Sequence, residues 1–225
     1  MKKVWNKYTI IGISCLGAFL LLMILLLTVD KVHNYVGAIG LYSFNKAFLV
    51  SYYNETWDVL SDVILYIALG FTVGLAIYGL YQLISKKSLF KVDKDIIFTG
   101  IGIVIIALLW IIFDKVFVVN YRPIVIDGLA DESFPSTHVM ITTFVLLISC
   151  RVILKRKPYS LKNTIAGYSG MSILVALCAL GRLLSCMHWM TDVLGGLFIG
   201  FGLYFLVVGL DKAFESKQQI QVVEE

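Results

Sequence analysis

Two histidines in this sequence have neighbours that could assist them in acid–base or nucleophilic chemistry. His188 stands four residues before Asp192, so on a helix the carboxylate could reach back to the imidazole ring. An aspartate in that place fixes the tautomer of the histidine and leaves its other ring nitrogen unprotonated and able to attack. His138 ends a Pro-Ser-Thr-His run that begins at Pro135. Such a run is typical of the start of a helix, where free backbone N–H groups can bind an anion.

Three cations fall near these two histidines: Lys115, Arg122 and Arg182. Each lies at or near one end of a long apolar stretch, where a charged group is costly and usually marks function. Lys115 and Arg122 are seven residues apart, about two helical turns, so they would share a face if their helix extends that far. Taken alone, this pair could be anchors whose charged ends snorkel to a membrane surface. Their grouping with two histidines and a carboxylate favours a functional site.

This set of residues suits an anion with tetrahedral oxygens. Three fixed cations and helix-end amides would neutralise a phosphoryl group and stabilise the charge of an in-line transition state. The two histidines would then divide the work as nucleophile and general acid. The sequence has no H-E-x-x-H motif, no Walker loop and no C-x-x-C pair among its four cysteines. Metal-binding, nucleotide-binding and disulfide-framework readings therefore have no support from motifs, and we expect no metal and no cofactor.

The elements that must position these residues are long apolar helices. Only 15% of the 225 residues are charged and 59% are hydrophobic, whereas a soluble domain carries about 25% charged residues. Six uncharged runs of about 18 residues or more could each cross roughly 30 Å of hydrocarbon as a helix, and they lack the alternation of membrane β-strands. Six such runs in one small chain argue against the buried helices of a soluble protein. We predict an all-α, polytopic membrane protein, a single membrane domain over residues 1–225, with transmembrane helices at 8–29, 63–85, 96–113, 135–154, 163–181 and 193–210.

Lysine and arginine fall mainly on one side of the predicted spans. Fourteen of the nineteen lie in the N-terminus, two of the loops and the C-terminal tail, all on the same side. Because cytoplasmic loops carry such an excess, we expect both termini in the cytoplasm and both histidines at the outer face. The net charge of +4 follows this sidedness and is no argument for nucleic acid.

Two parts of the chain outside the site have competing interpretations. The first apolar run follows Lys2, Lys3 and Lys7, as in a signal peptide, but it is longer than the apolar part of a signal and no A-x-A cleavage site follows it. We therefore expect an uncleaved span. The outer segment 30–57 mixes aromatic and polar residues. It could be a helix lying in the interface or a lid, or a plain connector with aromatic anchors.

Taken in order, the groups of candidate residues resemble the three-part signature of the type 2 phosphatidic-acid phosphatase superfamily, which also includes the vanadium haloperoxidases. The signature reads Lys115-x6-Arg122-Pro123, then Pro135-Ser136-Thr137-His138, then Arg182-x5-His188-x3-Asp192. It spans residues 115–192, and the six predicted spans extend the resemblance over most of the chain. The same six spans exclude a soluble haloperoxidase.

The resemblance implies a role for each residue of the signature. His188 would attack phosphorus and become a phosphohistidine, with Asp192 orienting it. His138 would protonate the leaving alcohol or phosphate and then activate the water that releases inorganic phosphate. The resemblance assigns the phosphoryl oxygens to five residues: Lys115, Arg122, Ser136, Thr137 and Arg182.

Two positions depart from the usual pattern of that superfamily. Thr137 stands where glycine is usual, which narrows the backbone freedom of the phosphate loop but keeps its amide as a donor. Gly181 stands where serine is usual before the arginine. The missing hydroxyl would cost roughly 1–3 kcal/mol if it bonded a charged oxygen. These departures bear on rate and substrate preference rather than on the reaction class.

The resemblance implies a lipid phosphate or diphosphate phosphatase of a bacterial plasma membrane, whose partners are its lipid substrate and the bilayer. An outward-facing site would favour undecaprenyl diphosphate or phosphatidylglycerophosphate, both of which present phosphate on a long lipid. One alternative is a phosphotransferase that passes the phosphoryl group to another lipid. A second is a non-catalytic binder or transporter of anionic lipids. The set of His138, His188 and Asp192 argues against this second alternative, because binding alone needs only the cations.

Overall fold

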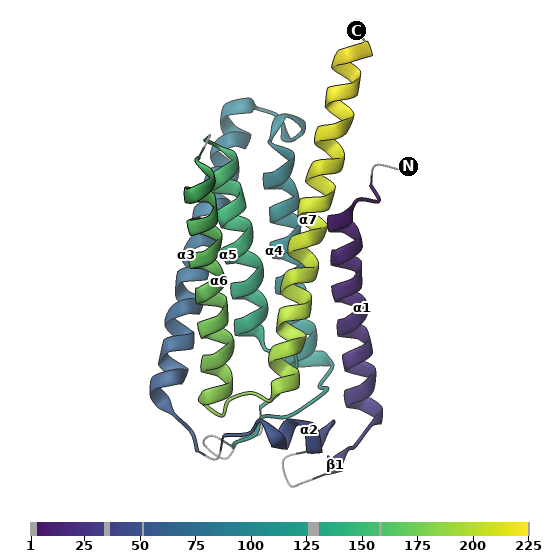
Figure 1. Cartoon of the computed structure of the whole chain (residues 1–225), viewed down its shortest axis with the longest axis vertical. Coiled ribbons are helices and arrows are strands. Elements are labelled where there is room, and N and C mark those ends of the chain that lie inside the picture. Colours follow the sequence, from purple (N-terminus) through teal and green to yellow (C-terminus); the bar gives the residue numbers. More distant parts are fainter. Residues whose placement is uncertain (1–3, 34–36, 51, 126–130, 158, 225) are drawn as a thin grey trace.

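A computed structural model describes residues 4–33, 37–50, 52–125, 131–157 and 159–224. Six long helices run side by side along the length of the molecule (Figure 1): α1 (Lys7–Thr28), α3 (Glu55–Lys86), α4 (Lys94–Ile111), α5 (Thr137–Lys155), α6 (Leu161–Leu184) and α7 (Met190–Glu224). The shorter elements are β1 (Val32–His33), β2 (Ala38–Ile39), α2 (Tyr42–Ala47), the 3-10 helix η1 (Leu89–Lys91) and the π-helix η2 (Ile112–Val116) that continues α4. Both ends of the chain lie at the same end of the bundle.

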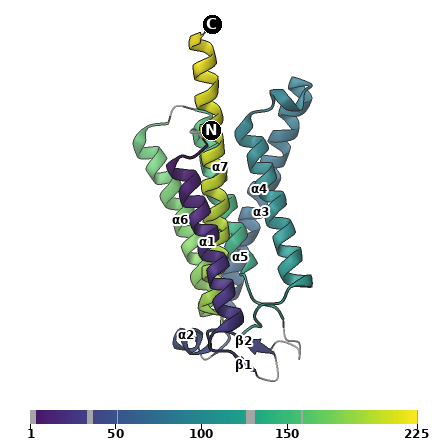
Figure 2. The same cartoon turned by 90° about the vertical axis from the view of Figure 1, so that its right-hand side faces the viewer.

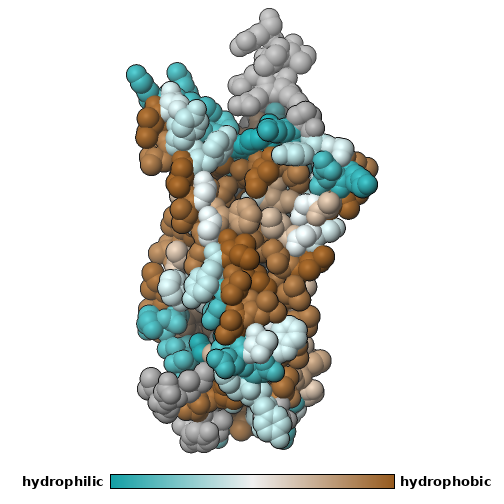
Figure 3. Space-filling view, turned by 90° about the vertical axis from the view of Figure 1, so that its left-hand side faces the viewer, coloured by the Kyte–Doolittle hydropathy of each residue, from teal (hydrophilic) through white to brown (hydrophobic). Residues whose placement is uncertain are grey.

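Each of the six long helices is long and apolar enough to cross a membrane. In hydrocarbon every backbone N–H and C=O group must be bonded within the segment, which a helix achieves by itself. Figure 2 shows the bundle turned by 90°, and Figure 3 shows a mostly hydrophobic belt of side chains between two hydrophilic ends. The predicted all-α membrane fold with six transmembrane helices is confirmed.

α5 is the innermost helix of the bundle. It is the most buried of the six spans, and it contacts α3, α4, α6 and α7. Small hydroxyl residues face its neighbours, and the Thr142 Oγ1 hydroxyl donates to the His138 carbonyl oxygen at 2.7 Å. Because His138 lies in the first turn of α5, this position places it at the centre of one end of the bundle.

Close backbone packing joins the start of α5 to the start of α7. A Cβ added at Gly196 of α7 would lie 2.6 Å from the Ser136 carbonyl oxygen, so only glycine allows this approach. The Ser136 backbone N–H in turn donates to the Asp192 carbonyl oxygen at 3.0 Å. Two segments of the signature that are far apart in the sequence are therefore fixed against one another.

α3 begins eight residues before the span predicted at 63–85, at Glu55. The Asn54 side chain caps it by accepting from the Trp57 backbone N–H at 3.2 Å. Asp58 and Asp62 consequently lie on the first two turns of a helix. The predicted outer segment 30–57 instead holds the β1–β2 hairpin, α2 and the start of α3.

The short helix α2 is tied to the end of the bundle through one buried residue, Asn45. Its Oδ1 accepts from the Thr191 backbone N–H at 3.1 Å, and its Nδ2 donates to the Gly40 carbonyl oxygen at 3.0 Å. Part of the outer segment therefore packs on the first turn of α7.

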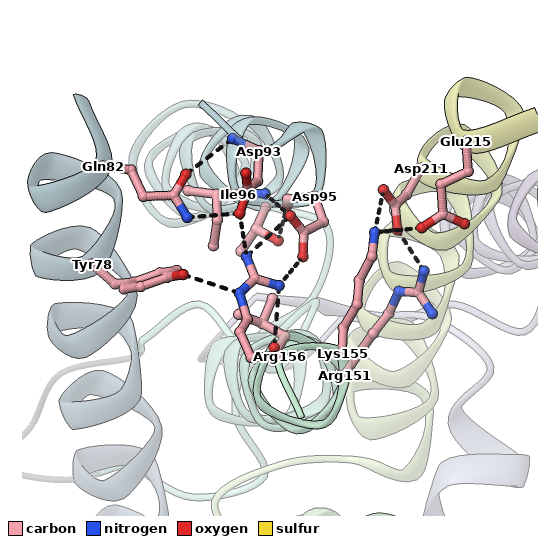
Figure 4. Close-up of polar contacts among 12 residues, drawn as sticks. Tyr78, Gln82, Asp93, Asp95, Ile96, Arg151, Lys155, Arg156, Asp211 and Glu215 are labelled. Atoms are coloured by element: carbon pink, nitrogen blue, oxygen red, sulfur yellow. Dashed lines mark hydrogen bonds and ion pairs between the residues drawn. The ribbon is translucent and has the colours of Figure 1, made fainter. Parts of the chain in front are cut away.

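Two buried carboxylates join the helices at the opposite end, where the termini lie (Figure 4). Asp95 of α4 is 2% exposed and accepts from both terminal nitrogens of Arg156, at 2.5 and 3.1 Å. Asp211 of α7 is 1% exposed and accepts from Arg151 at 2.5 Å and from Lys155 at 2.8 Å. A buried charge is costly unless it is paired, so these contacts stabilise the packing of α4 and α7 on α5. Cations counted above as signals of orientation thus also have a structural role.

Candidate active site

The candidate site lies at the end of the bundle opposite to the termini, where the loops before α5 and α7 meet (Figures 1 and 2). A cavity of about 50 Å³ opens there between η2, the loop after it, the first turn of α5 and the loop before α7. Its lining residues are Phe113, Asp114, Arg122, Glu132, Ser133, Phe134, Pro135, Thr137, His138 and His188. The tertiary structure therefore brings both predicted histidines to one cavity.

The carboxylate of Asp192 faces the ring of His188. α7 begins at Met190, so His188 precedes the helix, and its Nδ1 lies 3.5 Å from Asp192 Oδ2. The same Oδ2 accepts from the Trp189 backbone N–H at 2.9 Å, which is the bond that an acidic residue at the third helical position makes to the N-cap. Asn120 Nδ2 donates to Asp192 Oδ1 at 3.4 Å. Asp192 thus both holds the start of α7 and faces the imidazole.

His188 is a buried imidazole that is neutral at pH 7. It is 5% exposed, and neither ring nitrogen makes a hydrogen bond of normal geometry to a described residue. Burial lowers the pKa of His188 well below its ordinary value of 6.5, and the charges of Arg182 and Arg122 and the nearby His138 lower it further. An oriented, unprotonated ring with an unbonded nitrogen has the properties of a nucleophile.

His138 lies in the first turn of α5, with Ser136 as the N-cap residue. The Ser136 side chain makes no capping bond, and its buried Oγ has no partner in the described part of the chain. The first backbone N–H groups of α5 have no partner within the helix, so this end can bind an anion. His138 Nε2 is already engaged, because it lies 2.8 Å from Asp62 Oδ1 of α3.

Both arginines of the signature reach the site, and each keeps one unused buried nitrogen. Arg122 NH1 lies 3.6 Å from Asp131 Oδ2, and Arg182 NH1 donates to Asp58 Oδ1 at 2.6 Å. The Nε of each arginine is buried and has no hydrogen-bond partner among the residues that the structure describes. Arg122 lines the cavity, whereas Arg182 is buried beside His138 and His188 and is not in the cavity lining.

The structure does not bring Lys115 to the cavity. Its side chain is 71% exposed and its Nζ pairs with the adjacent Asp114 Oδ2 at 2.7 Å. η2 ends at Val116 and the chain continues without helix, so Lys115 and Arg122 do not share a helical face. The role of Lys115 in holding phosphate stays a prediction.

The two departures from the superfamily pattern have different surroundings. Thr137 is the first residue of α5 and lines the cavity, so its amide and hydroxyl are both near the site. Gly181 faces α3 rather than the cavity. A Cβ there would lie 3.0 Å from both the Trp57 carbonyl oxygen and the Ser61 Cβ, so glycine allows α3 and α6 to pack closely.

Sequence reasoning missed the residues that surround the signature. Asp58 contacts Arg182 and Asp62 contacts His138, but neither aspartate was among the predicted site residues. Their spacing of four residues at a helix start was the available signal. Asn120 had no such signal, because its contact with Asp192 joins residues 72 positions apart.

Comparisons with known proteins give a family match, a curated relative and a solved structure. The sequence profile of the PAP2 superfamily matches residues 116–214. Phosphatidylglycerophosphatase B of Bacillus subtilis (strain 168) is 30% identical over 100 residues, which is 44% of this chain and 48% of that protein, so the match spans about half of the relative's length. The crystal structure of a transmembrane PAP2 type phosphatidylglycerolphosphate phosphatase from Bacillus subtilis has the same fold, with a TM-score of 0.59 and 22% identity over 89% of this chain and 95% of that one. The matched range contains both histidines, both arginines and Asp192 of the signature, so residues 116–214 of this chain are similar to the PAP2 superfamily.

Proposed function

We propose that this protein is a membrane phosphatase that hydrolyses lipid phosphates or diphosphates through a phosphohistidine on His188. The observation that carries this proposal is a group of buried polar atoms around His188 that lack partners among the described residues. They are Arg122 Nε, Arg182 Nε, Ser136 Oγ and His188 Nε2. Each unmatched buried group costs about 1–3 kcal/mol. The positively charged arginine N–H groups are complementary to the oxygens of a phosphoryl group, and the neutral His188 ring is complementary to its phosphorus.

The geometry supports a mechanism in two steps. In the first, a ring nitrogen of His188 forms a bond to phosphorus as the P–O bond to the leaving group breaks, and His138 gives its proton to the leaving oxygen. Arg122, Arg182 and the start of α5 stabilise the charge on the phosphoryl oxygens, while Asp192 faces the developing imidazolium. In the second, His138 takes a proton from water, which attacks phosphorus and breaks the N–P bond. Inorganic phosphate and the free His188 result.

The site's position in the bundle supports a lipid substrate. The cavity lies at the end of apolar helices, where the phosphate of a lipid would meet it while the lipid tail stays in hydrocarbon. The names of the two Bacillus subtilis proteins favour phosphatidylglycerophosphate, and undecaprenyl diphosphate presents the same chemistry. The excess of Lys and Arg at the opposite end favours a site at the outer face of the plasma membrane.

The test is phosphate release by the purified protein in detergent, with both lipids as substrates. His188→Ala should abolish turnover, and His138→Ala should lower it by about 10²–10⁴-fold. The third histidine, His33, is exposed on β1, so His33→Ala is the matched control and should keep wild-type turnover.

The intermediate is tested by quenching the reaction in alkali, because the N–P bond of phosphohistidine is labile in acid. Label from a radioactive phosphate group should remain on the wild-type protein and be absent from His188→Ala. Wild-type turnover by His188→Ala would refute the mechanism. Substrate loss without phosphate release would show transfer to another lipid.

A further inference from the structure

One oxygen of Asp62 lies between two residues of the proposed active site. Asp62 Oδ1 is 2.8 Å from His138 Nε2 and 3.7 Å from Arg182 NH1. One helical turn earlier, Asp58 Oδ1 is 2.6 Å from the same Arg182 nitrogen but has no hydrogen bond to His138. The first two turns of α3 therefore supply separate carboxylate contacts to the arginine and the histidine.

These contacts depend on the close packing of α3 against α6. Gly181 precedes Arg182, and its missing Cβ leaves room for the buried Ser61, which lies between the two aspartates on α3. Ser61 Oγ lies 3.4 Å from Arg182 NH1 and donates to the Asp58 carbonyl oxygen at 2.8 Å. The departure of Gly181 from the superfamily pattern thus coincides with the approach of the α3 carboxylates to the site.

The position of Asp62 has an electrostatic consequence for His138. A general acid must carry a proton before the leaving oxygen departs, and a protonated imidazole beside the buried Arg182 is disfavoured by repulsion between like charges. A carboxylate between the two groups offsets that repulsion. It also fixes the ring, because Nε2–H donates to Asp62 and only Nδ1 is left for the substrate.

We propose that Asp62 is the positioning residue of the general acid, so that the protein uses two Asp–His pairs: Asp192 with the nucleophile and Asp62 with His138. This inference rests on the proposed phosphatase function. The proton on His138 Nδ1 passes to the leaving oxygen as the P–O bond breaks, and Nε2–H stays directed at Asp62. In the second step the proton from the attacking water returns to Nδ1.

The alternative is that Asp62 only pairs with Arg182 and helps α3 to pack. The two roles differ in their dependence on the leaving group. A nitrophenyl phosphate has a leaving group that departs without protonation, whereas the alcohol of an alkyl phosphate lipid needs the general acid. An aspartate that acts through His138 matters for the second substrate and little for the first.

The experiment compares Asp62→Asn with the matched control Asp58→Asn. Asp58 lies one turn earlier and contacts Arg182 and the Tyr53 hydroxyl, but makes no hydrogen bond to His138. With the alkyl lipid, Asp62→Asn should lower kcat on the order of 10²-fold with a small change in KM. With nitrophenyl phosphate the loss should nearly disappear. Asp58→Asn should change both substrates alike, mainly through KM, because it acts on the phosphate-binding arginine.

A double-mutant cycle supplies the second readout. In the His138→Ala background, Asp62→Asn should cause no further loss, since the residue through which it acts is gone. Asp58→Asn should keep its effect in the same background. Asp62→Glu, which retains a carboxylate, should recover part of the activity, and elution profile and melting temperature establish that each variant is folded.

Equal losses on both substrates, or additive losses in the double mutant, would overturn the assignment of Asp62. Undiminished turnover by Asp62→Asn would do the same. Absence of phosphate release by the wild-type protein from every substrate would instead refute the proposed function, so the two failures are distinguishable.

Discussion

At the scale of single residues, the neighbours of His188 favour different charge states before and after attack. Burial and the charges of Arg182 and Arg122 lower the pKa of the ring, so it is neutral when it meets the substrate. After attack the ring is cationic, and the Asp192 carboxylate 3.5 Å from Nδ1 faces that charge. At the same moment the arginines are occupied by phosphoryl oxygens in the proposed complex, which offsets their repulsion of the ring.

This arrangement makes a prediction about pH. Because the pKa of His188 is depressed, the nucleophile stays unprotonated down to a pH well below 6.5, and the acidic limb of kcat/KM should lie there. Arg122→Gln removes one repelling charge, so the pKa should rise and the limb should move to higher pH. The control is Lys46→Gln, which should leave the limb in place. Lys46 is a cation that stacks on Tyr42 of α2 and is absent from the cavity lining. The same substrate is used for all variants, so its own ionisation affects each pH profile equally. An acidic limb at the same pH in Arg122→Gln and the wild type would contradict this account.

At the scale of helices, polar contacts fix the bundle at both ends. At the site end, Asp58 and Asp62 of α3 meet Arg182 of α6 and His138 of α5. At the other end, Asp95 of α4 and Asp211 of α7 meet cations at the end of α5 (Figure 4). Apolar side chains cannot set the register of helices in lipid by the hydrophobic effect, because lipid tails are as apolar as the side chains. We infer that these charge pairs set the register.

A stability measurement tests the pair at Asp211. Asp211→Ala leaves the half-buried Arg151 and Lys155 without that carboxylate, and breaking a buried pair costs about 3–5 kcal/mol. Glu215→Ala is the matched control, since Glu215 pairs with the same Lys155 but is largely exposed, and such pairs are worth about 0–1 kcal/mol. Thermal unfolding in detergent should show a clearly lower midpoint for Asp211→Ala and a small change for Glu215→Ala. Equal midpoints would remove the structural role of the buried pair.

At the scale of the whole molecule, the two ends of the bundle differ in chemistry. One end holds the termini and the basic loops 86–94 and 151–162, and the other holds the candidate site. The uneven distribution of Lys and Arg orients a membrane protein during insertion. In the proposed function, that orientation decides which leaflet supplies the substrate.

Cysteine labelling on intact cells tests this orientation. The native Cys186 is a poor probe, because it is 2% exposed and its Sγ lies 3.1 Å from the Val50 carbonyl oxygen. In a background without the four native cysteines, Tyr52→Cys at an exposed position of the site end should react with a membrane-impermeant maleimide. Lys157→Cys, exposed at the opposite end, should react only after the membrane is opened. The reverse pattern would place the site at the cytoplasmic face.

The class of the fold and the three-part signature of the site can be read from the amino-acid sequence alone. Six apolar runs predict six spans because each charged side chain in hydrocarbon is costly. The Pro-Ser-Thr-His run predicts a helix start because the preference for these residue types at that place is local. The pairing of His188 with Asp192 was also readable, since the two are four residues apart. The partners that come from other helices are visible only in the folded arrangement of the bundle. Arg182 meets Asp58 across 124 residues and His138 meets Asp62 across 76, contacts that depend on how closely α3 packs on α6 and α5. For the same reason the sequence could not show that Gly181 is a packing position, or that Lys115 pairs with Asp114 and is not in the cavity lining.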